Sequence, residues 1–304
     1  MFGHSAGTVV TLLVLSSVAR AHTYITNIYV NGTEMDEGKC VKPFWDDTNY
    51  PVMDPNSKDL VCRAADQAAD DTDECGVTAG DTITVEIHDE ERDTIAIAEG
   101  HNGPCMVYMS PYSQMGDEPT WFKIYEAAYF PDKDRWCIDD LIDSKGKWDI
   151  TIPEDIKPGP YWLRAEIISL HEAERVYGED ESAGAQYYPM CVRINVSGSG
   201  TSVPKGVSIP GLYSPTEKGI NFNIYNGKKG SSTYTIPGPP VYKPGSTSAI
   251  GSGPTPVPET PIEKPVEEPV EQPIVKPPGK SCANGKTRKT RNRRRRRRRQ
   301  NREL

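Results

Sequence analysis

Hydrophobic and polar residues alternate along several short stretches between about residues 22 and 242. Residues 81–88 show the period of two that is typical of a β-strand with one buried face. This period places three aliphatic side chains on one side of the strand, namely Ile83, Val85 and Ile87. Residues 191–196 alternate in the same way, and turns such as Asn31-Gly32 separate the stretches. The pattern predicts an all-β fold, an antiparallel β-sandwich of roughly 200–220 residues.

The N-terminus resembles a secretory signal. Residues 8–15 are apolar, and Ala19-Arg20-Ala21 is a small-x-small cleavage site. The alternative is a buried N-terminal helix. Cleavage after Ala21 would make residues 1–21 a signal peptide, start the mature chain at His22 and place the protein outside the cell. In that compartment the sequons at Asn31 and Asn195 could be glycosylated.

The composition changes after Tyr242. Residues 241–280 contain ten prolines, five of which recur at every fourth position from Pro261 to Pro277. Such a segment cannot bury a core and favours polyproline II. We therefore predict a folded domain over residues 22–242, a Pro-rich linker over residues 243–280 and a disordered, Arg-rich tail over residues 281–304.

The charge is divided unevenly along the chain. Residues 281–304 hold 12 basic residues and one acid, a net charge of +11, so residues 1–280 carry −19 of the total of −8. The seven consecutive arginines from Arg293 to Arg299 could bind a polyanion by counterion release. Alternatively, the tail is clipped at its basic sites or balances the acidic domain. No apolar run of about 20 residues exists, so no membrane partner is expected.

Six of the seven cysteines lie in the predicted domain, and Cys282 lies in the tail. Secreted cysteines can pair, and six of them allow 15 pairings. Cys282 could pair between chains or be removed with the tail. No Cys-x-x-Cys motif is present, so a structural zinc site is not expected.

A histidine at a mature N-terminus can chelate one metal through its amine and its ring Nδ1. A second imidazole would give a three-nitrogen site, which suits copper. His101 lies on a loop flanked by glycine and proline, and Gln186 and Tyr188 share one side of an extended segment. Taken singly, His22 could be first by chance, His101 a solvated turn residue and Tyr188 a core residue.

Several motifs together resemble the fungal lytic polysaccharide monooxygenases of auxiliary activity family 9. The resemblance covers about residues 22–242. The motifs are, in order, His22 and residues 101–104, 107–110, 121–124, 152–153, 156–159, 161–171, 184–191 and 209–213. The family's fold is an immunoglobulin-like or fibronectin type III-like sandwich with long loops. Cys105 departs from the family, since an aliphatic residue is usual there.

The resemblance implies roles for matching positions. It implies His22, His101 and Tyr188 as copper ligands, and His171 and Gln186 as the catalytic pair that hydrogen-bonds the oxygen co-substrate. It implies the disulfide Cys62–Cys191, and we expect Cys40–Cys75 and Cys105–Cys137 as the other pairs. Tyr242 would stack on substrate at a flat face, or else belong to the linker. His88 has no role and is expected on the surface, and Arg164 and Glu166 are expected to form a structural ion pair.

The implied activity is oxidative cleavage of cellulose or related β-1,4-glucans. It uses one copper ion, an external electron donor and O2 or H2O2. The implied partners are a glucan surface and a reductant such as cellobiose dehydrogenase or small phenols, with the enzyme a monomer. A non-catalytic secreted copper- or glycan-binding sandwich is the alternative, as is a wall-attached protein whose basic tail is the active part.

Overall fold

The computed structural model describes residues 23–43, 50–63, 72–89, 91–92, 94–112, 120–180 and 182–245. The expected signal peptide, His22, Cys282, the tail and the linker beyond residue 245 lie outside the described residues.

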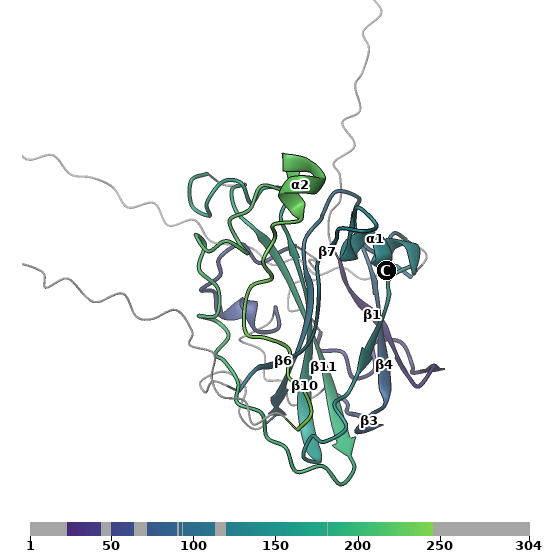
Figure 1. The fold of residues 1–304 in the computed structure, drawn as a ribbon. Coiled ribbons are helices and arrows are strands. Elements are labelled where there is room, and N and C mark those ends of the chain that lie inside the picture. The colour runs from purple at the N-terminus through teal and green to yellow at the C-terminus, as the bar shows by residue number, and fades with distance from the viewer. Residues whose placement is uncertain are drawn as a thin grey trace, which may run out of the picture. The chain divides into compact units, whose positions relative to one another are not determined.

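Two large β-sheets, with one further sheet of only two strands, make up the described domain (Figure 1). The four-stranded sheet has the order β2–β1–β4–β9, with every pair antiparallel. Its strands are β1 (Tyr24–Val30), β2 (Thr33–Glu34), β4 (Thr82–His88) and β9 (Lys147–Thr151). The five-stranded sheet has the order β3–β11–β10–β5–β6. Its strands are β3 (Cys75–Thr78), β5 (Cys105–Pro111), β6 (Phe122–Ala127), β10 (Gly159–Ser169) and β11 (Gln186–Ser197).

This architecture confirms the predicted all-β sandwich, with one difference. β3 runs parallel to β11, whereas the other pairs of that sheet are antiparallel. A parallel pair needs a long connection, and here about half of the domain lies between the two strands. The shorter elements are β7 (Tyr129–Phe130), β8 (Arg135–Trp136), α1 (Cys137–Asp143), α2 (Gly227–Ser231) and the 3-10 helices η1 (Lys58–Leu60) and η4 (Ile224–Asn226).

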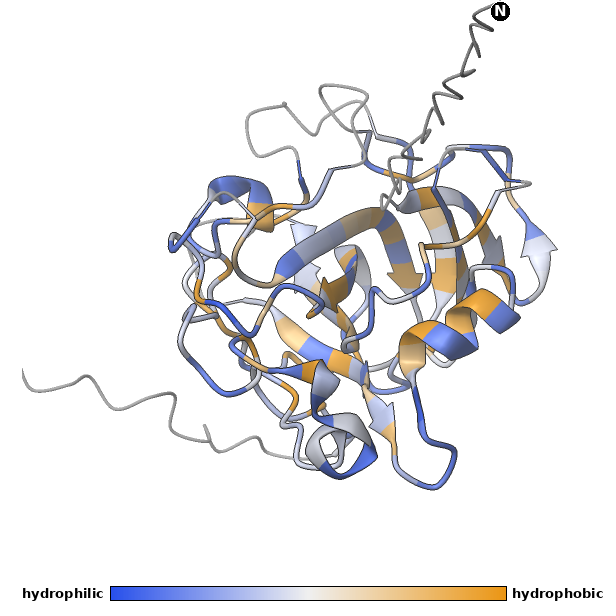
Figure 2. Cartoon of the chain, turned by 90° about the horizontal axis from the view of Figure 1, so that it is seen from above, coloured by the Kyte–Doolittle hydropathy of each residue, from blue (hydrophilic) through white to orange (hydrophobic). Residues whose placement is uncertain are grey.

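The alternating side chains of β4 and β11 point into the core between the sheets. Ile83, Val85 and Ile87 of β4 are fully buried. The alternating apolar residues of β11 are buried in the same cluster. Figure 2 shows hydrophobic residues along the strands and in α1, and hydrophilic residues in α2. A second cluster, which includes Trp162 and Tyr213, covers the other face of the five-stranded sheet. That sheet is therefore buried on both faces.

The prediction that His88 lies on the surface is wrong. It occupies the face of β4 opposite the core trio, yet only 3% of it is exposed. Its Nε2 lies 3.0 Å from Glu86 Oε1, and the Arg92 guanidinium donates to the same carboxylate. The loop that carries Arg92 covers this face, which the alternation of β4 alone does not reveal.

Buried polar contacts fix the segment before β3. Arg164 and Glu166 form the expected ion pair, with 2.6 Å between Nη2 and Oε1 and both side chains fully buried. The Arg164 guanidinium also donates to the carbonyl of Leu60 at 2.7 Å and to that of Val61 at 2.8 Å. The structure contains the three expected disulfides, Cys40–Cys75, Cys62–Cys191 and Cys105–Cys137.

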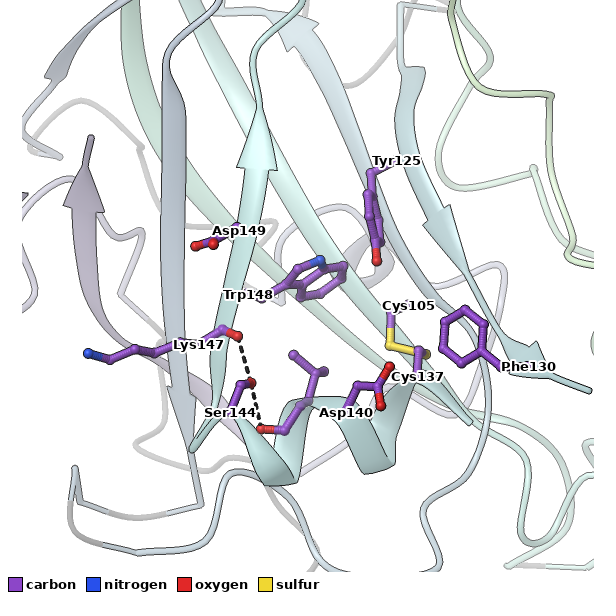
Figure 3. Close-up of a pocket in the computed structure, with 10 residues that line it drawn as sticks. Cys105, Tyr125, Phe130, Cys137, Asp140, Ser144, Lys147, Trp148 and Asp149 are labelled. Carbon is purple, nitrogen blue, oxygen red and sulfur yellow. Dashed lines mark hydrogen bonds between the residues drawn. A yellow bond between two sulfur atoms is a disulfide. The ribbon is translucent and has the colours of Figure 1, made fainter. Parts of the chain in front are cut away.

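Helix α1 closes a pocket of about 230 Å³ at the edge strands β6 and β9. Figure 3 shows the rings of Tyr125, Phe130 and Trp148 around the Cys105–Cys137 disulfide. The helix begins where Asp139 accepts a hydrogen bond from the Trp136 backbone N–H at 2.8 Å. None of the candidate site residues lines this pocket, so it is separate from the centre described next.

Candidate metal centre

The candidate residues gather at one end of the five-stranded sheet. His101 precedes β5, His171 follows β10, and Gln186 begins β11. The register pairs Ser169 with Gln186 and Ile167 with Tyr188. Because β5, β10 and β11 are antiparallel neighbours, the start of β5, the end of β10 and the start of β11 meet at this end of the sheet.

The His101 loop is held from two sides. Leu170 N donates to Asn102 O at 2.8 Å, and Ile168 N donates to Pro104 O at 3.1 Å. A Cβ on Gly103 would lie 1.8 Å from Ile168 O, so only glycine fits this close approach. On the other side, the disulfide sulfur of Cys137 lies 3.1 Å from Gly103 O. The loop therefore has little freedom to move its histidine.

His101 is buried, and its Nδ1 lies 3.1 Å from the carbonyl oxygen of Ala98. Since a carbonyl only accepts, Nδ1 carries the proton and donates it. In a neutral ring, Nε2 is then the nitrogen with the lone pair. A neutral imidazole oriented in this way by a carbonyl is the usual form of a metal-binding histidine.

His171 lies beside His101, with ring centroids 4.3 Å apart and planes tilted by 50°. Its Nδ1 lies 3.0 Å from Ser169 Oγ. Burial lowers the pKa of His171 below its ordinary value, although the nearby Glu172 carboxylate acts in the opposite direction. His171 is therefore a neutral imidazole at pH 7.

Tyr188 completes the cluster, with its ring centroid 6.4 Å from that of His101. Its hydroxyl donates to Gln186 Oε1 at 2.9 Å. Burial raises the pKa of the Tyr188 phenol far above its ordinary value, although Arg63 lowers it in part. The group is therefore a neutral phenol, whose oxygen could act only as a weak donor to a metal.

His22 lies outside the described residues, but its neighbour Thr23 is placed. Thr23 is fully buried, and its Oγ1 donates to Ala96 O at 2.7 Å, on the segment that leads to His101. Within the described part of the chain, no group of three or more His, Cys, Asp or Glu side chains could hold a metal.

Tyr242 is not at this end of the sandwich, so its expected role in substrate stacking is wrong. Its backbone N–H donates to Lys123 O, near the start of β6. Its hydroxyl donates to Asp155 Oδ2 at 2.7 Å, in the β9–β10 connection at the opposite end. Only 9% of the residue is exposed, and its ring packs against Phe122.

Two residues near the centre were missed by the sequence analysis. Tyr225 is 67% exposed, and its hydroxyl donates to the carbonyl of His171 at 3.0 Å. Arg63 contacts both Thr23 and Tyr188. In the sequence, only its position directly after the disulfide cysteine Cys62 indicates that Arg63 could lie near the centre. The sequon residues Asn31 and Asn195 are both exposed, as glycosylation requires.

Known proteins resemble this chain in sequence and in fold. The sequence profile of Auxiliary Activity family 9 (formerly GH61) matches residues 22–234. The AA9 family lytic polysaccharide monooxygenase A of Aspergillus niger is 41% identical over 244 residues, which cover 78% of this chain and 56% of that protein. This chain thus spans little more than half the length of that relative.

Solved structures show the same likeness. The structure titled CvAA9A has a TM-score of 0.67 at 31% identity and covers 73% of this chain and 98% of its own. A cellulose-active polysaccharide monooxygenase from M. thermophila has a TM-score of 0.58 at 28% identity, over 73% of this chain and 99% of its own. On this profile match, identity and fold, the chain belongs to auxiliary activity family 9.

Proposed function

We propose that this protein is a secreted, copper-dependent lytic polysaccharide monooxygenase that oxidatively cleaves cellulose or related β-1,4-glucans. The observation that carries the proposal is the orientation of His101. Its Nδ1 proton is committed to Ala98 O, which leaves Nε2 as the donor nitrogen in a cluster with His171 and Tyr188. Family membership supports the metal, since auxiliary activity family 9 is generally copper-dependent.

The donor set fits copper. His101 would supply Nε2, His22 its amine and ring Nδ1, and Tyr188 a weak neutral oxygen. Neutral nitrogen donors suit copper, which also heads the affinity order of divalent first-row metals. When bound and reduced by an external donor, copper would supply the activation of O2 or H2O2 that breaks a C–H bond beside the glycosidic oxygen.

The protein's own groups orient the oxygen co-substrate and handle protons. Gln186 Oε1 already accepts from Tyr188, so the amide NH2 is the group with which Gln186 would donate to the co-substrate. His171 keeps Nδ1 beside Ser169 Oγ, so Nε2 is the atom at which it would exchange a proton.

The substrate would lie across the end of the sheet instead of entering a pocket. Tyr225 presents an exposed ring there, fixed through its hydroxyl to the carbonyl of His171. An aromatic face of this kind can pack against the apolar face of a pyranose. Cellulose is favoured because a structurally similar protein is described as cellulose-active. The expected reductant remains cellobiose dehydrogenase or a small phenol.

Secretion and the chain's organisation are part of the proposal. Cleavage after Ala21 would expose the amine of His22, which the copper site requires. The catalytic domain would span residues 22–242, with the linker and basic tail after it and the protein a monomer. Within the described residues, no helix is long and apolar enough to cross a membrane.

The test is product analysis. The mature protein, loaded with one equivalent of copper and supplied with ascorbate and H2O2, is incubated with amorphous cellulose and with xyloglucan. Mass spectrometry should detect oligosaccharides carrying one extra oxygen, or the ketone formed from it, on at least one substrate. Native oligosaccharides alone, or none, would support the non-catalytic alternative. A metal-free sample treated identically is the control.

A further inference from the structure

Arg63 has an unusual backbone conformation for an arginine. Its φ is 62°, in the left-handed region that few residues other than glycine, asparagine and aspartate adopt. Its side chain points inward, and only 5% of the residue is exposed. A long charged side chain kept at such a position indicates that the side chain has a task there.

The backbone that carries Arg63 is rigidly attached to the five-stranded sheet. The preceding residue, Cys62, is joined to β11 through the Cys62–Cys191 disulfide. Leu60 and Val61 accept hydrogen bonds from the buried Arg164 guanidinium on β10. Arg63 N donates to Asp59 O at 2.6 Å. The base of the Arg63 side chain is therefore fixed relative to β10 and β11.

From this base the guanidinium reaches two parts of the candidate centre. Its Nη1 donates to the carbonyl oxygen of Thr23 at 2.9 Å. Its central carbon lies 5.4 Å from the centroid of the Tyr188 ring. Thr23 is the residue after His22 and leads directly into β1. Arg63 thus connects the start of the mature chain to the strand that carries Tyr188.

We propose, on the basis of the copper site proposed above, that Arg63 is a positioning residue of the metal centre. Its guanidinium holds the start of β1, and with it the ligand His22, in register with Tyr188. The amine and ring of an N-terminal residue have no chain before them to fix their direction. The Thr23 carbonyl, on the residue after His22, is a backbone group by which the protein can hold them.

The charge of Arg63 has a second consequence. A guanidinium is protonated at every accessible pH, so it places a permanent positive charge beside the centre. Such a charge favours Cu(I) over Cu(II), because the reduced ion carries less positive charge. Asp89 is also close enough to influence Tyr188 electrostatically and acts in the opposite direction. Removing Arg63 alone would therefore lower the reduction potential of the copper.

Three variants separate position from charge. Arg63→Met removes the charge and the hydrogen bond but keeps an unbranched apolar stem. Arg63→Lys keeps the charge and loses the planar fork that fits the carbonyl and the ring. Arg193→Met is the matched control, since Arg193 also donates to a backbone carbonyl, that of Thr72 at 3.1 Å, and stacks on a tyrosine, Tyr112.

Copper affinity is measured by calorimetry, the reduction potential by redox titration and the geometry by electron paramagnetic resonance. Arg63→Met should bind copper about tenfold or more weakly, with a lower potential and an altered Cu(II) spectrum. Arg63→Lys should keep a potential nearer to that of the wild type while its spectrum still changes. Arg193→Met should match the wild type in all three. Equal behaviour of Arg63→Met and Arg193→Met would overturn the proposal.

Hydrogen exchange of the metal-free proteins provides a readout that needs no copper. The start of β1 should exchange faster in Arg63→Met than in the wild type or in Arg193→Met. A wild type that shows this difference but binds no copper would contradict the proposed function and leave the anchoring role in place. Unchanged exchange would contradict the anchoring role itself.

Discussion

The rings of His101 and His171 lie 4.3 Å apart, although they belong to loops at the ends of two different strands. Two features of the sequence bring them together. The antiparallel register of β5 and β10 places Cys105 opposite Ile167, and Gly103 lets the His101 loop lie directly on the backbone of Ile168. Strand pairing and this close backbone contact therefore help to place His101 beside His171.

Replacing His101 by alanine should abolish the proposed centre. The variant loses the His101 Nε2 donor, so copper affinity should fall by at least about 100-fold. Calorimetric titration of the metal-free protein measures this. A fall of less than tenfold would show that copper binds elsewhere.

The Tyr188 hydroxyl should affect the metal's geometry more than its affinity. Tyr188→Phe keeps the ring but breaks the 2.9 Å hydrogen bond to Gln186. We expect copper affinity to change by less than about tenfold, because the nitrogen donors remain. The Cu(II) resonance spectrum should change, and the yield of oxidised product should fall. An unchanged spectrum would show that the phenol oxygen does not face the metal.

The Cys105–Cys137 disulfide should stabilise the fold and also position the His101 loop. The double variant Cys105→Ala/Cys137→Ala should lose about 2–4 kcal/mol in the free energy of unfolding. It also removes the contact between Cys137 Sγ and Gly103 O, so copper affinity should fall as well. Denaturant unfolding and calorimetry measure the two effects.

The Cys40–Cys75 disulfide is a matched control for that prediction. It joins residues 35 apart, against 32 for Cys105–Cys137, so removing either should cost similar loop entropy. Only the Cys105–Cys137 pair touches the His101 loop. If both double variants lose the same copper affinity, the loss comes from general destabilisation.

Tyr225 should contribute to substrate binding and not to metal binding. Removing its exposed ring by Tyr225→Ala takes away about 0.5–1.5 kcal/mol of aromatic packing, which is roughly two- to twelvefold in affinity for cellulose. Copper affinity should be unchanged. Pull-down of the protein with cellulose measures the effect, and binding equal to that of the wild type would remove Tyr225 from the proposed surface.

Glu86 should make stability depend on acidic pH. Burial alone raises the pKa of its carboxyl, but hydrogen bonds from Arg92, Tyr29 and His88 outweigh this and hold the pKa at about 2. A depressed pKa stabilises the fold above the unfolded value near 4.3, and this contribution is lost as the pH falls towards about 2. The wild type should therefore lose stability more steeply between about pH 5 and pH 2 than Glu86→Gln does. Parallel unfolding curves for the two proteins would refute this role.

The basic tail should affect retention on anionic polymers. Deleting residues 281–304 should leave oxidation of soluble glucan unchanged but weaken binding to an immobilised polyanion such as heparin. The difference should shrink when salt rises from about 50 to 200 mM, because tail binding releases counterions. Equal retention of the full-length and shortened proteins would favour the alternative that the tail has no polymer to bind.

The sequence predicts the parts of this structure that depend on local pattern. The alternation of Ile83, Val85 and Ile87 is enough to place them in the core, and the turn around His101 is visible in its glycine and proline. The sequence does not predict which faces of the strands are covered by segments that are distant in the chain. His88 is buried by a loop that carries Arg92. The hydroxyl of Tyr242 donates a hydrogen bond to Asp155 at the far end of the sandwich. Arg63 is recognisable only once Thr23 and Tyr188 are seen on either side of it.

The central claim is that copper is held jointly by His101 and the free N-terminus of His22. Calorimetric copper titration of two metal-free proteins tests it most directly, one beginning at His22 and one with a single glycine before it. We predict one tight site in the first protein and at least about 100-fold weaker binding in the second, because the added residue removes the chelating amine. Equal affinities of the two proteins would contradict the claim.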